Sequence, residues 1–256
     1  MTTARLRAEG SFFTTTGEDR SRRLAPTERT DRGMARTAIL NFHGIGKPGR
    51  ALEPGEDRFW ISRDAYRRIL DAVAARAGGP DVAITFDDGN LSDLEIGAPE
   101  LEARGLTATF FVLAGRLDSR GSLSTADLGT LLAAGHRIGL HGHDHVDWRG
   151  LDAGGRVREF DTARAVLAVA TGAPIDQAAI PFGRYDRGVL AALRVRGFEA
   201  VHTSDRGLVR GTPWLRPRTC VRGDMDAAAI EAALRGRMTP PARLRRALGV
   251  ARKRLF

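Results

Sequence analysis

The chain has 256 residues, of which 42% are hydrophobic and 28% are charged. This length and composition indicate a soluble globular protein with one large domain and a sizeable core. A single cysteine, Cys220, excludes an intrachain disulfide and any zinc site built from several cysteines. Because no Cys-His signature surrounds it, we expect a buried structural thiol rather than a nucleophile.

The net charge of +9 lies mainly at the two ends of the chain. Residues 1–36 carry a net +3 and residues 235–256 carry +8, which leaves −2 for residues 37–234. A nearly neutral body argues against specific nucleic-acid binding. Residues 1–33 contain no apolar segment typical of a secretory signal, and no stretch approaches the ~20 apolar residues of a membrane span, so we expect a cytoplasmic protein.

Three regions follow from the pattern of residues. Residues 1–36 are rich in Thr, Arg and Glu without periodicity and predict a flexible basic arm. Residues 37–238 predict a folded domain, and residues 239–256 a basic amphipathic tail. Strands are predicted at 37–46, 81–89, 106–114, 136–141, 177–183, 199–205 and 214–222. Helices are predicted near 63–77, 93–104, 125–134, 155–171, 187–196 and 225–236.

Strands that alternate with helices predict right-handed βαβ units and a parallel sheet. Several predicted helices are followed by a glycine, the residue favoured just beyond a helix C-terminus: Gly78, Gly105, Gly135, Gly172 and Gly197. Seven strands of this kind suit a closed or nearly closed barrel. In such barrels functional groups collect at the carboxyl ends of the strands.

The segment AITFDDGN (83–90) ends a predicted strand with two adjacent carboxylates, Asp87 and Asp88. Each raises the pKa of the other unless a positive group compensates. Alone, the pair is explained equally well by a turn or a helix cap. His141 and His145 follow another strand four residues apart, and two imidazoles with one carboxylate form a metal-binding set with open positions. Together, the two segments favour a metal site.

The order and spacing of TFDDGN, IGLHGHDHVDW and IPFGRYD resemble the polysaccharide deacetylase family, or NodB homology domain. The resemblance covers residues 38–222, about three quarters of the chain. It implies a distorted (β/α)7 barrel, an α/β fold with parallel strands. It also implies removal of N- or O-acetyl groups from a glycan with one divalent metal ion, for which we expect Zn²⁺.

Carried over residue by residue, the resemblance implies that Asp87 is the general base. The implied metal ligands are Asp88, His141 and His145, while His143 falls on a variable position and is expected to turn away. The implied substrate-binding residues are Pro181, Phe182, Gly183 and Tyr185, to which we add Asp205 from the rim of the next strand. In this chain Gly142 replaces the family's Ser or Thr, which normally braces the histidine loop.

Two further positions depart from the family pattern. The arginine that normally orients the catalytic base would fall at Ala179, and the late histidine that supplies the acid has no counterpart, because no histidine follows His202. His43 and His202 are the candidates for the missing acid. We expect His43, because a strand end flanked by glycine brings the chain close to a ligand.

The tail RLRRALGVARKRLF places Leu244, Leu248, Ala251 and Leu255 on one helical face, with Arg and Lys elsewhere. Such a helix could contact an anionic membrane surface, or could equally pack on the barrel with its basic face in solvent. For the whole chain, the favoured function is deacetylation of a glycan or glycoconjugate. The alternatives are hydrolysis of a small-molecule amide and glycan binding by a protein that has lost catalysis.

Overall fold

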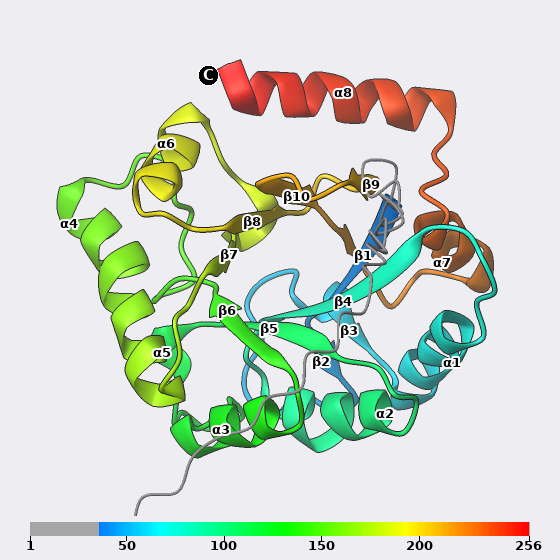
Figure 1. Cartoon of the computed structure of the whole chain (residues 1–256), viewed down its shortest axis with the longest axis horizontal. Helices are drawn as coiled ribbons and strands as arrows, with labels where there is room; N and C mark the ends of the chain where they lie inside the picture. Colours follow the sequence, from blue (N-terminus) through cyan, green and yellow to red (C-terminus); the bar gives the residue numbers. More distant parts are fainter. Residues whose placement is uncertain (1–35, 256) are drawn as a thin grey trace, which may run out of the picture. The chain divides into compact units, whose positions relative to one another are not determined.

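The computed structural model describes residues 36–255, in which eight strands form a nearly closed barrel surrounded by helices (Figure 1). The strands are β1 (Arg36–Phe42), β4 (Asp81–Asp88), β5 (Ala108–Val112), β6 (Arg137–Leu140), β7 (Gln177–Ala179), β8 (Ala200–Thr203), β10 (Leu215–Pro217) and β11 (Thr219–Cys220). Their order along the sheet is β10-β8-β7-β6-β5-β4-β1-β11, and every neighbouring pair is parallel.

Near-closure of the barrel depends on its last strand. β10 pairs with β8, whereas β11 pairs with β1, and a single residue, Arg218, separates the two. β10 and β11 therefore act as one bent strand that joins the two ends of the sheet. Counted in this way, the barrel has seven strands, and the predicted distorted (β/α)7 fold is confirmed.

The helices lie around the outside of the barrel (Figure 1). They are α1 (Arg63–Ala74), α2 (Ala98–Glu102), α3 (Thr125–Ala133), α4 (Ala153–Arg156), α5 (Ala163–Thr171), α6 (Arg187–Val195), α7 (Ala227–Leu234) and α8 (Pro240–Leu255). A π-helical turn, η2 (Asp93–Gly97), precedes α2, and another, η4 (Val157–Thr162), joins α4 to α5. Every helix predicted from the sequence is present.

Local sequence explains where these helices begin and end. Ser124 caps α3 in a reciprocal arrangement with Asp127, and Asp186 caps α6 through the N–H of Val189. The five glycines expected after helices all have positive φ, as at Gly172, where φ is 63°.

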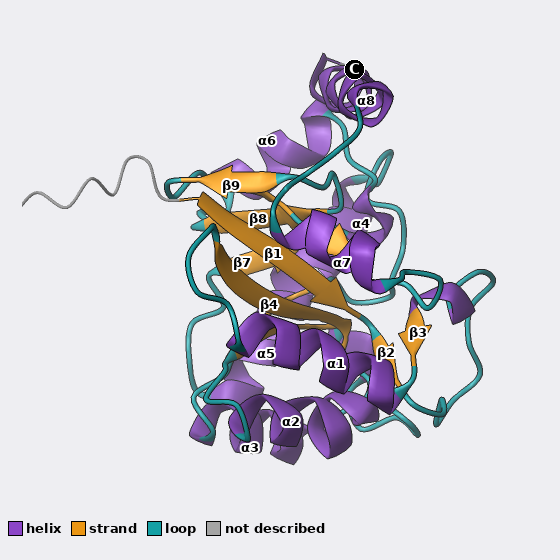
Figure 2. Ribbon diagram, turned by 90° about the vertical axis from the view of Figure 1, so that its right-hand side faces the viewer, coloured by secondary structure: helices purple, strands orange, loops and turns teal. Residues whose placement is uncertain are grey.

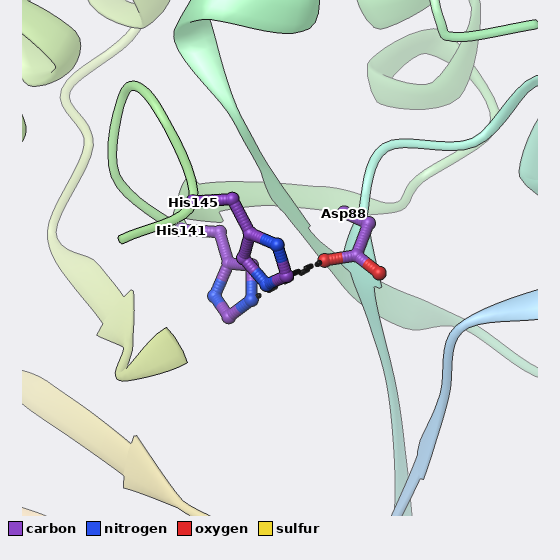
Figure 3. A group of neighbouring side chains, drawn as sticks. All are labelled: Asp88, His141 and His145. Atoms are coloured by element: carbon purple, nitrogen blue, oxygen red, sulfur yellow. Dashed lines mark ion pairs between the residues drawn. The ribbon is translucent and has the colours of Figure 1, made fainter. Parts of the chain in front are cut away.

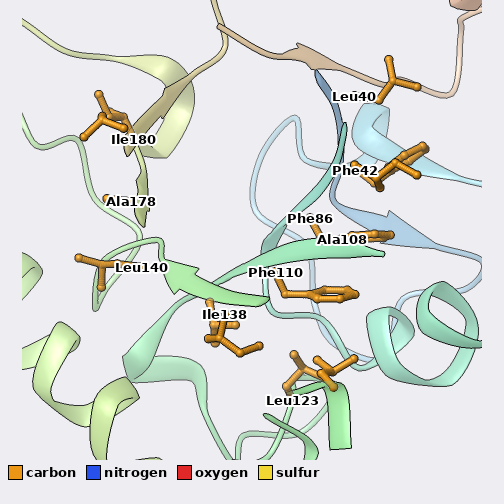
Figure 4. Close-up of a cluster of buried hydrophobic side chains, with 14 of the residues drawn as sticks. Leu40, Phe42, Phe86, Ala108, Phe110, Leu123, Ile138, Leu140, Ala178 and Ile180 are labelled. Atoms are coloured by element: carbon orange, nitrogen blue, oxygen red, sulfur yellow. The ribbon is translucent and has the colours of Figure 1, made fainter. Parts of the chain in front are cut away.

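Alternation along the strands separates the apolar core from the interior of the barrel. Phe42, Phe86 and Phe110 belong to a cluster that also contains residues of α1, α2 and α3, and Figure 4 shows this cluster around the strands. The neighbours of these phenylalanines along the strands, such as Asn41 and Asp87, point to the opposite face and form a buried polar network inside the barrel. The apolar core therefore lies between the strands and the helices, while polar residues occupy the interior of the barrel.

Two short strands were not predicted: β9 (Leu208–Arg210), which pairs antiparallel with β1, and β3 (Trp60–Ile61). The strand predicted at 37–46 is interrupted at His43, and its end, β2 (Gly44–Ile45), pairs with β3 in a separate two-stranded sheet. Figure 2 shows the arrow of β1 pointing toward the side of the barrel on which β2 and β3 lie. That side carries the carboxyl ends of the strands, where functional residues were expected.

The flexible arm predicted for residues 1–36 lies outside the described residues, apart from Arg36, which begins β1. The predicted C-terminal tail corresponds to α8. Among the helices within residues 36–255, none combines the length and the apolarity that a membrane crossing requires.

Candidate metal centre and active site

Two strand ends bring the three predicted metal ligands together (Figure 3). Asp88 ends β4, His141 directly follows β6, and His145 lies in the loop beyond it. Oδ1 of Asp88 is 3.5 Å from Nε2 of His141 and 3.4 Å from Nε2 of His145. One ligand atom from each residue lies within 4.8 Å of the other two. This spacing allows all three residues to contact one ion.

A hydrogen bond at the other ring nitrogen fixes each imidazole. Nδ1 of His141 is 2.9 Å from the carbonyl oxygen of Ala179, and Nδ1 of His145 is 2.9 Å from Oε2 of Glu53. Because both partners are acceptors, each Nδ1 carries the proton and each Nε2 presents its lone pair toward Asp88. Burial also lowers the pKa of His141, which keeps that ring neutral, as a metal ligand must be.

Glu53 is a site residue that the sequence did not reveal. It lies 92 residues before His145, in the segment between β2 and β3, and no motif singles it out. Its carboxylate is also paired with Arg116. A carboxylate that accepts the Nδ1–H of a ligand histidine orients the ring and increases its basicity. Glu53 would therefore support a metal ion held by His145.

The buried carboxylate of Asp88 fits a cation. Asp88 is 2% exposed, and residues 36–255 provide no hydrogen-bond donor for its Oδ1. A buried carboxylate oxygen without a donor is costly unless a positive charge compensates. Two imidazole nitrogens and one carboxylate oxygen match the ligand set of Zn²⁺ and similar ions, with positions left for water and substrate.

Glu159 braces the loop between the two histidines. Its Oε2 accepts from the backbone N–H of His143 at 2.9 Å and from Nε1 of Trp148 at 3.1 Å, while its Oε1 accepts from the N–H of Asp144 at 2.9 Å. Gly142 has a φ of 97°, and a Cβ there would lie 2.4 Å from Oε2 of Glu159. The glycine thus lets the buried carboxylate approach and supply the brace that a Ser or Thr would have provided.

Arg218 holds the predicted catalytic base. Its Nη1 donates to Oδ1 of Asp87 at 2.7 Å and its Nη2 donates to Oδ2 at 2.8 Å, which forms a two-pronged ion pair. Arg218 is fully buried and Asp87 is 3% exposed. Asn41 also donates to Oδ2 of Asp87 at 2.9 Å, so the carboxylate has a fixed orientation.

The pKa of Asp87 follows from this arrangement. Burial alone would raise it, but the charge and the hydrogen bonds of the Arg218 guanidinium outweigh burial. The pKa of Asp87 therefore lies well below its usual range, and the carboxylate is ionised at neutral pH. An ionised, oriented carboxylate beside a metal site can accept a proton from an attacking water.

A cavity of about 200 Å³ opens beside these residues. Its lining includes the predicted base, the three predicted metal ligands, the predicted acid His43, and Glu53. Phe59 and Phe182 also line the cavity, and each packs on a histidine: the ring centroids are 4.6 Å apart for His43 and Phe59, and 4.4 Å for His145 and Phe182. Arg58 and Arg184 lie over the outer faces of the two phenylalanine rings. The opening therefore combines aromatic surface with positive charge.

Comparison with known proteins decides the family. The model of the polysaccharide deacetylase family matches residues 74–201, half of the chain, including the two carboxylates, both ligand histidines and the Pro181–Gly183 turn. The chain belongs to the polysaccharide deacetylase family. A curated relative, YxkH of Bacillus subtilis (strain 168), bears the name of this family and is 23% identical over 185 residues. The match covers 68% of this chain and 66% of that relative.

Solved structures show the same fold. A polysaccharide deacetylase from Bacillus cereus superposes with a TM-score of 0.68 and 16% identity over 78% of this chain and 69% of that one. A Streptococcus pyogenes deacetylase in complex with acetate gives a TM-score of 0.67 with 17% identity over 78% of this chain and 99% of that one. At these identities the likeness supports the barrel rather than a particular substrate.

The structure accounts for the first departure from the family pattern. Ala179 occupies the position of the family's arginine and is fully buried at the end of β7. Arg218 supplies a guanidinium to Asp87 from the junction of β10 and β11, 131 residues along the chain. No motif marks Arg218 in the sequence, but β11 pairs with β1 and β1 pairs with β4, so Arg218 lies only two strands from Asp87.

The two candidates for the missing acid lie in different environments. His43 lines the cavity, and its Nδ1 is buried without a hydrogen-bond partner among residues 36–255. His202 is 3% exposed, its Nε2 is 3.0 Å from Oε1 of Gln177, and its ring packs on Phe111. Burial lowers the pKa of His202 well below its usual value. The geometry therefore favours His43 as a group that can reach substrate.

Of the predicted substrate-binding residues, Phe182 lines the cavity, whereas Tyr185 and Asp205 lie behind it. Phe182 is half-exposed in the Pro181–Gly183 turn and lines the cavity with a φ of 57°. Tyr185 is buried, and its hydroxyl donates to Oδ2 of Asp205 at 2.6 Å. Tyr185 and Asp205 thus hold each other next to the turn, and Ser204 and Arg184 join Phe182 in the cavity lining.

Cys220 differs from the expectation of a fully buried thiol. It is partly exposed and lines the cavity, where its Sγ lies 3.4 Å from Oγ of Ser204.

Backbone strain concentrates at the cavity: of five non-glycine residues with positive φ in the described chain, Asp88, His145 and Phe182 lie at the cavity. Such conformations persist where the surrounding structure holds them, commonly at functional sites.

Proposed function

We propose that this protein is a metal-dependent hydrolase that removes acetyl groups from a glycan or glycoconjugate. Membership of the polysaccharide deacetylase family supports an acetylated polysaccharide as substrate. The observation that carries the proposal is the buried pair of Asp87 and Arg218 beside the grouped ligands Asp88, His141 and His145. Residence in the cytoplasm remains a prediction from the sequence.

Asp88, His141 and His145 would hold one divalent ion, with Zn²⁺ the expected metal. When bound, such an ion supplies Lewis acidity, which lowers the pKa of water to ≈ 7 and polarises an acyl oxygen. Ala179 and Glu53 fix the orientation of the two imidazoles through hydrogen bonds. This preorganisation limits the cost of ordering the site on binding.

Asp87 would act as the general base. Its Oδ2 lies 3.9 Å from Nε2 of His141, so it faces the region of the ligand nitrogens. Held ionised by Arg218, this carboxylate would accept a proton at Oδ2 from the water that attacks the acetyl carbon. His43, which lines the same cavity, would give a proton to the departing amine or hydroxyl of the sugar.

The cavity walls support a sugar as substrate. Phe59 and Phe182 offer apolar surface for the C–H face of a pyranose ring, and the volume of about 200 Å³ suits an acetyl group with part of one sugar residue. Arg58 and Arg184 provide donors at the rim for hydroxyl or acidic groups.

The test is to measure bound metal and acetate release from acetylated chitooligosaccharides and acetylated xylan with the purified full chain. We expect bound metal and release in the wild type, loss of both in Asp88→Asn, and loss of release alone in Asp87→Asn. His43→Ala should lose turnover by about 100-fold or more with metal retained, whereas His202→Gln serves as the matched control.

Other outcomes assign a different function. Bound metal without release on a broad panel would favour a glycan-binding protein that has lost catalysis. Release from small amides but not from glycans would favour the small-molecule hydrolase. Turnover that survives His43→Ala would remove His43 as the acid while leaving the base and ligands in place.

A further inference from the structure

The C-terminal helix α8 is attached to the barrel through its basic residues. Nζ of Lys253 donates to Oδ1 of Asp205 at 2.7 Å and to the carbonyl oxygen of Gly183 at 2.8 Å. Nε of Arg246 donates to the carbonyl oxygens of Asp205 and Arg206 at 2.7 and 2.8 Å. Figures 1 and 2 show α8 outside the barrel wall, beyond β8 and β10. The polar side of this helix therefore faces the protein.

The opposite side of α8 is apolar and points away from the barrel. Leu244, Leu248 and Leu255 are 61%, 63% and 68% exposed, and Ala251 between them is also exposed. Spacings of four, three and four residues place these side chains on one face. An amphipathic helix in a globular protein normally turns such a face toward the core. Here the orientation is reversed: Arg246 and Lys253 contact the barrel, and the leucines are exposed.

Positive charge borders this apolar face. Arg243, Arg245, Arg252 and Arg254 are all exposed, and α8 contains six basic residues and no acidic one. A row of leucines flanked by arginines is the pattern of a helix that lies in a membrane interface, with arginines at the level of anionic headgroups. A second copy of the chain fits less well, because facing helices would bring four exposed arginines against four.

We propose that α8 binds the surface of a membrane that contains anionic lipid. Leu244, Leu248 and Leu255 insert among the lipid chains, and the flanking arginines contact lipid phosphates. Lys253 links α8 to the turn that contains Phe182, so attachment holds the wall of the cavity near the lipid surface. The interaction goes beyond the proposed hydrolysis and does not depend on it.

The test is sedimentation of the full chain with vesicles of phosphatidylcholine alone and with vesicles that also contain phosphatidylglycerol. We expect binding to the anionic vesicles, weakened by salt, and at least tenfold weaker binding for the triple variant Leu244→Ser, Leu248→Ser, Leu255→Ser. The matched control is Val169→Ser with Val195→Ser, since these valines are 85% and 81% exposed on α5 and α6. The control should bind as the wild type does.

Circular dichroism and unfolding temperature verify that both variants are folded. Equal vesicle binding by the triple variant and the wild type would overturn the proposal, as would equal binding to neutral and anionic vesicles. A wild-type dimer that the leucine changes convert to a monomer, without vesicle binding in either, would assign the face to a second copy. Acetate release from soluble oligosaccharides is measured separately, so failure here leaves the proposed hydrolase intact.

Discussion

Replacement of Arg218 by methionine tests whether the relocated guanidinium holds the catalytic base. Methionine keeps much of the apolar stem but removes both charged hydrogen bonds to Asp87, at 2.7 and 2.8 Å. Because both side chains are buried, Asp87 would be left without a compensating charge. Removal of one partner of a buried pair costs about 3–5 kcal/mol, so we expect the free energy of unfolding to fall by that amount.

Urea unfolding measures this loss, and a double-mutant cycle assigns it to the pair. Arg218→Met combined with Asp87→Asn should be less destabilised than the sum of the single changes, by about 2 kcal/mol or more, because no unpaired charge remains. Without urea, and at a pH at which Arg218→Met is folded, acetate release by this variant should fall at least tenfold relative to the wild type while bound metal is retained. A loss below ~1 kcal/mol with no coupling would refute the reasoning.

Three further changes test other parts of the site and fold. Glu53→Gln should weaken metal binding by about 10–100-fold in a chelator competition, because His145 loses its charged acceptor; unchanged affinity would remove Glu53 from the support of the metal. Gly142→Ala should lower the free energy of unfolding by roughly 1–3 kcal/mol, because its φ is 97° and the new Cβ would meet Glu159, and an unaltered urea midpoint would contradict this. Hydrogen bonding from neighbouring arginines lowers the pKa of Glu100 to about 2. The charge of Glu100 therefore stabilises the fold fully at pH values above the pKa of ≈ 4.3 in the unfolded chain, and this stabilisation is lost as the pH falls through about 2. Because those arginines are partly exposed, Glu100→Gln should cost only about 1 kcal/mol at pH 7, and the difference from wild type should vanish toward pH 2; a difference that is constant with pH would contradict the assignment.

The sequence predicted most of the fold because the necessary information is local. The pattern of apolar residues and the glycines after helices located all seven strands and six helices of the barrel, and the tail helix as well. The proposed metal ligands could also be found in the sequence, since Asp88 ends a predicted strand and His141 and His145 are four residues apart. Carboxyl ends of parallel strands meet at one edge, so these three positions could be expected to converge.

The supporting residues were not predictable, because they come from distant parts of the chain. Arg218 reaches Asp87 only because the last strand bends between β8 and β1, and Glu53 reaches His145 across 92 residues. Glu159 replaces a missing Ser or Thr from a π-helical turn that no motif marks.

The C-terminal helix α8 shows which of its properties follow from the sequence pattern and which depend on tertiary contacts. The amphipathic character of α8 can be predicted from the sequence, since periodicity fixes which residues share a face. Which face meets the barrel depends instead on the polar groups that the barrel surface presents to the helix. It offers the carboxylate of Asp205 and the carbonyl oxygens of Gly183 and Arg206, so Lys253 and Arg246 face inward. The leucines are consequently left on the outer surface.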